Sequence, residues 1–170
     1  MLNSSEIIIE PTKEEDIPTI VEMIASEKEA LVPVDGEELG VWVREGRSFV
    51  ARDNKGRIIG HQAIAVWAES GWIELRSAFV LPECRGSGTN TAMKRLVLSQ
   101  VFQSTPNATM VGFTEPASKS RGILKKLNFQ LIPLDTVPDE FFRICPASCY
   151  KKTGQPCGCE VYILRKSKED

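Results

Sequence analysis

The chain has 170 residues, 42% of them hydrophobic and 26% charged, and a formal net charge of -2 at pH 7. This composition allows a hydrophobic core, and the nearly neutral charge excludes the clustered basic excess that phosphate backbones require. Neither a basic start with a long apolar run nor a run of roughly 20 apolar residues is present. We therefore expect one cytoplasmic domain over residues 1–170, with no nucleic-acid partner and no membrane partner.

The first half of the chain predicts a strand, two helices and three more strands. Residues 7–9 form a β-branched opening strand. The helix that follows carries apolar residues at helical spacing and begins at Asp16, since Pro18 is tolerated only in a first helical turn. A weaker helix over 36–45 precedes three strands at 48–52, 57–67 and 72–80, and Gly56 supplies the hairpin turn between the first two.

The second half alternates helices and strands. Apolar spacing predicts a helix over 89–103, a buried strand over 109–114 and a helix over 118–127. Two further strands are expected at 129–134 and 160–165. This order predicts a mixed α/β (α+β) domain built in layers.

The loop that follows the third of these strands carries most of the functional argument. Pro82 ends the strand, and Gly86 and Gly88 precede the long helix. Glycines let backbone approach a ligand, while the free N–H groups and the dipole at a helix N-terminus favour an anion. Such a place binds a diphosphate without many lysines. The alternative is an ordinary tight turn, and the spacing fits neither the dinucleotide fingerprint nor the P-loop.

The pattern V-x-P-x-x-R-G-x-G at this loop resembles the acetyl-CoA signature of GNAT acetyltransferases. Asn90 stands where that family usually has Gly or Ala, so its side chain is expected to crowd the phosphate. Residues 49–63 resemble the family's hairpin and residues 117–129 its late helix. The resemblance implies a mostly antiparallel twisted sheet flanked by helices, with acetyl-CoA as cosubstrate. The residues it implies at the cofactor are Phe79, Val80, Arg85, Gly86, Ser87, Gly88, Thr89 and Asn90.

Three stretches, at 31–39, 74–80 and 129–141, more closely resemble the acetyltransferase domain of N-acetylglutamate synthases. That branch acetylates the α-amine of an amino acid. Val34-Asp35 replaces its usual arginine-serine pair, so the acceptor stays open between glutamate, another amino acid, a polyamine and a protein amine. The assembly also stays open, with a homodimer among the options.

Acetyl transfer needs a base for the amine, and Glu74 is the candidate. Histone-acetylating members of the superfamily place a catalytic glutamate at what looks like the matching strand position. The alternative is that Glu74 pairs with Arg76 along the same strand face. A backbone N–H of Phe79 or Val80 would stabilise the oxyanion, as the resemblance implies.

The late helix departs from the family pattern at Leu124, where many members have a tyrosine that protonates the leaving thiolate. Leucine cannot donate a proton, so solvent, Tyr150 or Tyr162 are the alternatives. Asn128 replaces the usual glycine at the end of this helix, and asparagine tolerates left-handed backbone. His61, the only histidine, is interpreted as a structural residue.

A cysteine-rich insertion is expected at about 143–159. It holds the candidate zinc ligands Cys145, Cys149, Cys157 and Cys159. Four thiolates complete a closed tetrahedral zinc shell, which is a structural type of site. Reduced thiols or one disulfide are the alternatives, since the spacing departs from common zinc pairs.

The sequence thus predicts an N-acetyltransferase that moves acetyl from acetyl-CoA to a primary amine of a small molecule, with an amino acid among the candidates. Leu124 and Asn90 motivate a second reading, a GNAT-like domain that binds acyl-CoA without turnover. A third reading makes the cysteine segment a zinc-stabilised docking module.

Overall fold

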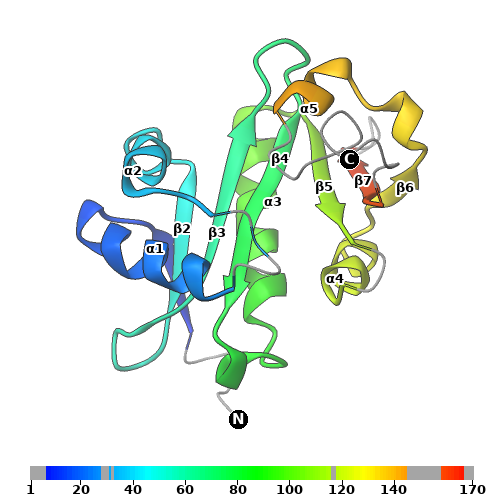
Figure 1. Ribbon diagram of the computed structural model, residues 1–170. Helices are drawn as coiled ribbons and strands as arrows, with labels where there is room; N and C mark the ends of the chain where they lie inside the picture. The colour runs from blue at the N-terminus through cyan, green and yellow to red at the C-terminus, as the bar shows by residue number, and fades with distance from the viewer. Residues whose placement is uncertain (1–6, 28–30, 32, 116–117, 145–157, 167–170) are drawn as a thin grey trace. The chain divides into compact units, whose positions relative to one another are not determined.

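The structure is a computed structural model that describes residues 7–27, 31, 33–115, 118–144 and 158–166. Its strands are β1 (Ile8–Pro11), β2 (Ser48–Arg52), β3 (Ile58–Val66), β4 (Ile73–Val80), β5 (Thr109–Thr114), β6 (Gln130–Ile132) and β7 (Glu160–Arg165). Its α-helices are α1 (Ile17–Ser26), α2 (Gly36–Arg44), α3 (Thr89–Ser104), α4 (Ser120–Lys126) and α5 (Asp139–Ile144) (Figure 1). Short 3-10 helices cover Glu14–Asp16, Pro82–Cys84 and Leu134–Thr136.

The strands form one seven-stranded mixed sheet in the order β1-β2-β3-β4-β5-β7-β6. β4 and β5 run parallel, whereas β1 with β2, β2 with β3, β5 with β7 and β6 with β7 are antiparallel. The expected mixed, mostly antiparallel sheet flanked by helices is therefore confirmed. The chain also divides into two compact units, residues 1–65 with 75–99 and residues 66–74 with 100–170. The single domain over 1–170 stays a prediction.

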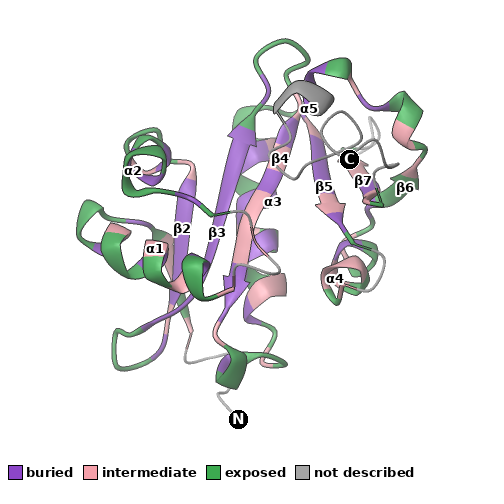
Figure 2. Cartoon of the chain, in the orientation of Figure 1, coloured by how far each residue is buried: buried purple, intermediate pink, exposed green. Residues whose placement is uncertain are grey.

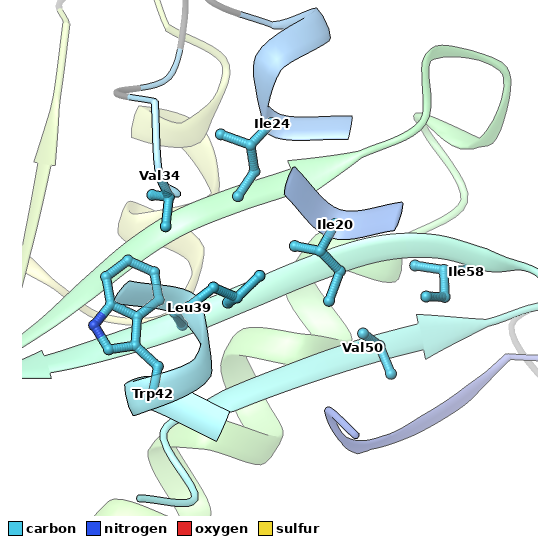
Figure 3. Close-up of a cluster of buried hydrophobic side chains, with 8 residues drawn as sticks. Ile20, Ile24, Val34, Leu39, Trp42, Val50 and Ile58 are labelled. Carbon is cyan, nitrogen blue, oxygen red and sulfur yellow. The ribbon is translucent and has the colours of Figure 1, made fainter. Parts of the chain in front are cut away.

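In the first unit, helices cover both faces of the strands. On one face, α1 and α2 contribute Ile20 and Leu39 to a buried cluster with Val50 of β2 (Figure 3). On the other face, Met93 of α3 packs with Ala51 in a separate buried cluster. Successive residues of a strand point to opposite faces, so Val50 and Ala51 contact helices on opposite sides of β2. Burying this apolar surface is the main force that seats the three helices.

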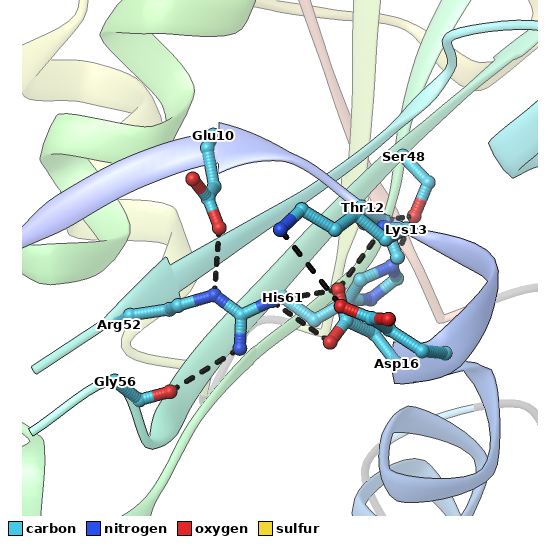
Figure 4. A network of polar contacts seen from close by, with 9 residues as sticks. Glu10, Thr12, Lys13, Asp16, Ser48, Arg52, Gly56 and His61 are labelled. Atoms are coloured by element: carbon cyan, nitrogen blue, oxygen red, sulfur yellow. Dashed lines mark hydrogen bonds and ion pairs between the residues drawn. The ribbon is translucent and has the colours of Figure 1, made fainter.

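A polar network ties β1 and β2 to the start of α1 (Figure 4). Asp16 occupies the expected N-cap position of α1, but its side chain makes no capping hydrogen bond to that helix. It accepts instead from the amide of Lys13 at 3.0 Å and from Nη2 of Arg52 at 2.8 Å. Arg52 also donates from Nε to Glu10 at 2.7 Å. Hydrogen bonds to Asp16 and Glu10 raise the pKa of the Arg52 guanidinium, so this group stays charged.

In the second unit, a stacked aromatic cluster forms the core. Trp67 stacks on Phe113 and Phe141, whose own ring centroids lie 3.9 Å apart. The nearby Glu140 of α5 accepts hydrogen bonds from the amide of Glu69 at 3.1 Å and from that of Ser70 at 3.0 Å. The carboxylate thereby satisfies the turn between β3 and β4. α5 has no counterpart in the sequence-based prediction.

Burial along β3 shows why that strand is central to the first unit. Its first eight residues are buried and only Val66 is exposed (Figure 2). Two polar side chains, His61 and Gln62, lie within this buried stretch at 0% exposure. Buried polar groups need hydrogen-bond partners, so these two residues must be satisfied inside the protein. Across the described residues, no helix combines the length and apolar character that a membrane span requires.

Candidate cofactor-binding site

The loop between β4 and α3 is open and depends on its glycines for backbone conformation. Gly86 and Gly88 both have a φ of +87°, which side-chain-bearing residues rarely adopt. A Cβ at either position would meet nothing within 4 Å. Both glycines are exposed. The glycines therefore serve a left-handed backbone in open space, as a turn that approaches a ligand requires.

The amide N–H groups of residues 86–91 also indicate that this loop could bind a ligand. Within the part of the chain that the structure describes, none of them donates to a protein acceptor. The first helical bond of α3 runs from Ala92 N to Gly88 O at 2.9 Å. Amides in a first turn have no acceptor inside their own helix, and the dipole of a 16-residue helix is positive there. The loop thus offers a row of donors suited to a diphosphate.

Side-chain hydrogen bonds hold this loop in shape. Ser87 Oγ donates to the carbonyl of Cys84 at 2.7 Å and lies 2.7 Å from Thr89 Oγ1. Thr89 is only 2% exposed, so its hydroxyl is engaged within the loop by Ser87. Cys84 is also buried, which agrees with a packing role for its side chain.

Arg85 also holds the loop in place through its guanidinium group. Its Nε donates to the carbonyl of Val80 at 2.9 Å, and its Nη2 donates to Glu27 at the end of α1 at 2.7 Å. The guanidinium is therefore already occupied by a carbonyl and a carboxylate. Arg85 therefore helps to fix the position of the loop.

The side chain of Asn90 is engaged by a neighbour on α3. Its Oδ1 accepts from Nζ of Lys94, one turn further along α3, at 2.8 Å. The crowding of a bound phosphate by this side chain stays a prediction. The backbone amide of Asn90 is among the loop amides that find no acceptor within the described residues.

Lys94 is a residue that the sequence analysis missed. It is only 3% exposed, and burial lowers the pKa of its ammonium group to about 7. Its Nζ also donates to Oε1 of Gln62 on β3 at 2.8 Å. The signal was present in the sequence, because Lys94 lies at helical spacing with the buried Leu98 and Val101. A lysine within an apolar stripe is a candidate for a special role.

The strand that leads into the loop is bent at Ser77, whose φ is +50°. The alternation of buried and half-buried residues along β4 stops at this point. Two side chains of β3 bind the carbonyls here: Gln62 Nε2 donates to Arg76 O at 2.9 Å, and His61 Nδ1 lies 3.0 Å from Ser77 O. These bonds satisfy the carbonyls of Arg76 and Ser77.

His61 is a structural residue, as interpreted from the sequence. A carbonyl only accepts hydrogen bonds, so Nδ1 carries the proton toward Ser77 O, and Nε2 accepts from Ser48 Oγ at 3.0 Å. Ser48 then accepts from Thr12, whose Oγ1 lies 2.7 Å away (Figure 4). Burial lowers the pKa of His61 to about 4. A ring with 0% exposure and both nitrogens bonded has no access to a substrate.

Glu74, the candidate base, belongs to the second unit. Its side chain is half-buried, and its Oε2 accepts from Nε1 of Trp67 at 3.2 Å. Arg76, the alternative partner, lies with its guanidinium 5.8 Å over the ring of Trp42 and 3.8 Å from Glu38. Phe79 and Val80, the candidate oxyanion residues, follow the bend at Ser77 and are buried.

Leu124 stands at the position expected for the general acid, and it is a packing residue. Leu124 is 2% exposed, and a Cβ at Gly112 would lie 3.0 Å from its Cδ1. Leu124 therefore fills the space above a glycine of β5. Tyr162 is 0% exposed and its hydroxyl donates to Glu160 at 2.7 Å, so it is poorly placed to protonate a thiolate. Asn128 adopts the expected left-handed conformation, with a φ of +64°.

The zinc prediction concerns residues that lie largely outside the described part of the chain. Tyr150 and the cysteines Cys145, Cys149 and Cys157 all lie there. Cys159 is described and half-buried. Among the described residues, no group of three or more His, Cys, Asp or Glu side chains is arranged to hold a metal ion. The zinc site stays a prediction.

Comparison with solved structures identifies the fold. N-acetylglutamate synthase from Neisseria gonorrhoeae, complexed with coenzyme A and N-acetyl-glutamate, matches 94% of this chain with 17% identity and a TM-score of 0.74. The chain spans about a third (35%) of that protein. Rv2747 from Mycobacterium tuberculosis, in complex with CoA, matches 94% of this chain and 99% of its own, with 17% identity and a TM-score of 0.72.

A third similar structure is yncA, a putative acetyltransferase from Salmonella typhimurium with its cofactor acetyl-CoA. It matches 96% of both chains with 16% identity and a TM-score of 0.67. No family model matches the sequence, and no curated protein matches it either. At these identities the likeness establishes the fold, which is that of the GNAT acetyltransferases.

Proposed function

We propose that this protein is an acetyl-CoA-dependent N-acetyltransferase that binds the cofactor diphosphate at the loop between β4 and α3. The observation that carries the proposal is the row of amides over residues 86–91 that find no acceptor among the described residues, on a loop with two glycines at φ +87°. Similar structures that contain coenzyme A or acetyl-CoA support the choice of ligand. Binding would involve Phe79, Val80, Arg85, Gly86, Ser87, Gly88, Thr89 and Asn90.

Most of these residues would act through backbone amides. Arg85 and Ser87 already bond to protein groups, so they would hold the loop in shape. Thr89 and Asn90 would offer amides at the first turn of α3. Helix N-termini bind phosphates in this way without a formal positive charge. The slight net negative charge of the chain is therefore no obstacle to the proposed anion site.

In the proposed reaction, an acceptor amine attacks the thioester carbonyl, so a C–N bond forms and the C–S bond breaks. Glu74 takes the amine proton, directly or through a water molecule. The hydrogen bond from Trp67 fixes the rotamer of this carboxylate. An amide near Phe79 or Val80 stabilises the oxyanion that develops on the carbonyl. The leaving thiolate takes its proton from solvent, because Leu124 has none to give.

The acceptor we propose is a small-molecule amine, with α-amino acids first among the candidates. The sequence stretches that resemble N-acetylglutamate synthases support this choice, as does the fold likeness to such an enzyme. The panel that tests it should pair each amino acid with its decarboxylated amine, for example glutamate with γ-aminobutyrate. Polyamines and peptide N-termini complete the panel, because the sequence also leaves those acceptors open.

The experiment is a thermal-shift titration with acetyl-CoA, followed by measurement of free thiol release over the amine panel. A ligand that binds only the native state stabilises it by mass action, and at a ligand concentration of 100 times Kd the free energy of unfolding increases by about 2.7 kcal/mol. The melting temperature rises accordingly. We expect a saturable shift and amine-dependent thiol release. An unchanged melting temperature at saturating acetyl-CoA would refute the proposal.

A second candidate function is an acyl-CoA sensor without turnover. The buried Leu124 favours it, because a leucine at this position has no proton to give to the thiolate. The two candidates differ in one outcome of the same experiment. A clear thermal shift without thiol release for any amine would favour the sensor, whereas release with one class of amine would establish the transferase.

A further inference from the structure

Lys94 lies in an environment that is unusual for a lysine. It is 3% exposed, and its Nζ donates to two neutral oxygens, Oε1 of Gln62 and Oδ1 of Asn90, each at 2.8 Å. Within the described residues it has no carboxylate partner. Burying an ammonium group without a counter-ion is costly unless hydrogen bonds satisfy it. Desolvation accordingly lowers the pKa of Lys94 to about 7.

The orientation of the Gln62 amide makes this contact directional. Its Nε2 donates to the carbonyl of Ala63 at 2.7 Å and to the carbonyl of Arg76 at 2.9 Å. Carbonyls only accept hydrogen bonds, so the nitrogen of the amide must face them and the oxygen must face Lys94. Each donor and acceptor group of the Gln62 side chain is therefore engaged, and the amide cannot flip without losing bonds.

These bonds form one continuous path within the first unit. The path starts at Asn90 in the first turn of α3, passes through Lys94 and Gln62, and ends at the carbonyl of Arg76. Arg76 directly precedes Ser77, where β4 bends with a φ of +50°. One end of the path is the loop with unpaired amides, and the other end is the bend that precedes Phe79 and Val80.

We propose that Lys94 is a positioning residue that links the phosphate loop to the bend in β4, so that cofactor binding and acetyl transfer share one geometry. The inference rests on the proposed acetyltransferase function. Through Asn90, Lys94 holds the first turn of α3, whose amides would bind the diphosphate. Through Gln62, it holds the backbone of β4, whose next amides would receive the thioester carbonyl. Lys94 itself touches neither reacting atom.

The test is steady-state kinetics of Lys94→Met, which keeps the length and apolar stem of the side chain. The substitution removes the donor shared by Gln62 and Asn90. Losing a hydrogen bond to a charged group costs about tenfold or more, so we expect kcat to fall and KM for acetyl-CoA to rise, each about 10-fold. The matched control is Arg95→Met, which removes a positive charge from the exposed neighbour on α3.

Two further variants separate the ends of the path. Asn90→Ala should raise KM for acetyl-CoA and leave kcat nearly unchanged, because only the loop loses its support. Gln62→Met should lower kcat and leave KM nearly unchanged, because only the bend in β4 loses its support. A double-mutant cycle of Asn90→Ala with Lys94→Met should be non-additive in KM, since both remove the same contact.

The outcomes distinguish this inference from the proposed function. If wild-type protein shows neither acetyl-CoA binding nor turnover, both fail together. If wild type is active while folded Lys94→Met matches Arg95→Met in kcat and KM, the lysine is merely structural and only this inference is overturned. Should Lys94→Met not fold, the split between Asn90→Ala and Gln62→Met decides, and equal effects of both on kcat and KM would overturn it.

Discussion

The β2–β3 turn and the loop before α3 both contain glycines with positive φ, yet they differ in what happens to their amides. In the β2–β3 turn, Gly56 has a φ of +79° and its amide donates to the carbonyl of Asp53 at 3.0 Å. Oδ1 of Asp53 accepts from the amides of Lys55 and Arg57, each at 3.0 Å. The amides of this turn are therefore hydrogen-bonded within the turn. A glycine turn of this kind stabilises a hairpin and leaves nothing for a ligand.

The loop before α3 has the same backbone feature and the opposite result. Gly86 and Gly88 give it positive φ twice, but none of its amides over residues 86–91 finds an acceptor among the described residues. Its side chains, such as Ser87, bond to carbonyls and hydroxyls and leave the donors open. Unpaired donors, and not glycines alone, therefore mark the candidate anion site.

The largest expected effect comes from adding methyl groups to the open loop. Gly86→Ala with Gly88→Ala forces two residues at φ +87° into a strained conformation, at about 1–3 kcal/mol each. We expect the loop to change shape and the Kd for acetyl-CoA to rise by about 100-fold, which corresponds to about 2.7 kcal/mol. Isothermal titration calorimetry measures this change directly.

The matched control for that variant is Gly56→Ala in the self-satisfied turn. A Cβ there also meets nothing within 4 Å and suffers similar strain, so the melting temperature should fall. Affinity for acetyl-CoA should stay at the wild-type value. Equal losses of affinity in both variants would mean that the loop has no special part in binding.

The second prediction concerns Lys94 and the dependence of protein stability on pH. Burial lowers the pKa of Lys94 from 10.5 to about 7, so the unfolded chain binds more protons between these values. Stability should therefore rise as pH increases from about 7 to about 10.5. The free energy of unfolding, measured by urea denaturation across this range, should rise more steeply in wild type than in Lys94→Met. Parallel pH profiles would refute the burial of an uncompensated ammonium.

The third prediction concerns Asp53, whose stabilising effect is lost only in acid. Desolvation raises its pKa, but hydrogen bonds from Arg57 and Lys55 outweigh this and hold the pKa below 3.8. Its contribution is present above pH 3.8 and is lost as pH falls through the lower folded-state pKa. Asp53→Asn should flatten this acid limb of the stability curve and leave acetyl-CoA affinity unchanged. A steep acid limb that persists in the variant would contradict the role assigned to this carboxylate.

The smallest expected effect is that of Ser87→Ala. The hydroxyl of Ser87 holds the open loop through one bond to a carbonyl, which is worth about 0.5–1.5 kcal/mol. We expect acetyl-CoA affinity to fall by about threefold to tenfold with little change in melting temperature. Fluorescence competition with a labelled CoA resolves a change of this size. A loss of stability without a loss of affinity would place Ser87 with the structural residues of the hairpin turn.

Much of the fold was predictable because local patterns agree with the final structure. The strands at 48–52, 109–114 and 160–165 were predicted at their observed bounds. Their patterns are flanked by turn residues, so the limits are visible in the sequence. The left-handed Asn128 was also expected, because asparagine tolerates that backbone. The loop at Gly86 and Gly88 was also predictable, because its glycines are a local signal in the sequence.

Other features depend on contacts between residues distant in sequence, and these were missed. Ser77 gives no sequence signal for its positive φ, which the bonds from β3 to neighbouring carbonyls stabilise. The link between Lys94 and Gln62 joins residues 32 positions apart. α5 is short and acidic at its start, and Glu140 anchors it to a turn about 70 residues away. Patterns of hydrophobicity carry no information about such pairings.

The most direct test of the account is an NMR titration of 15N-labelled protein with coenzyme A, following the backbone amides of the loop. The account predicts that the amide protons of Gly86 and Gly88 move downfield saturably, as N–H groups do when they bind phosphate oxygens, while that of Gly56 stays in place. Unchanged loop amides at a concentration that saturates binding elsewhere on the protein would contradict it.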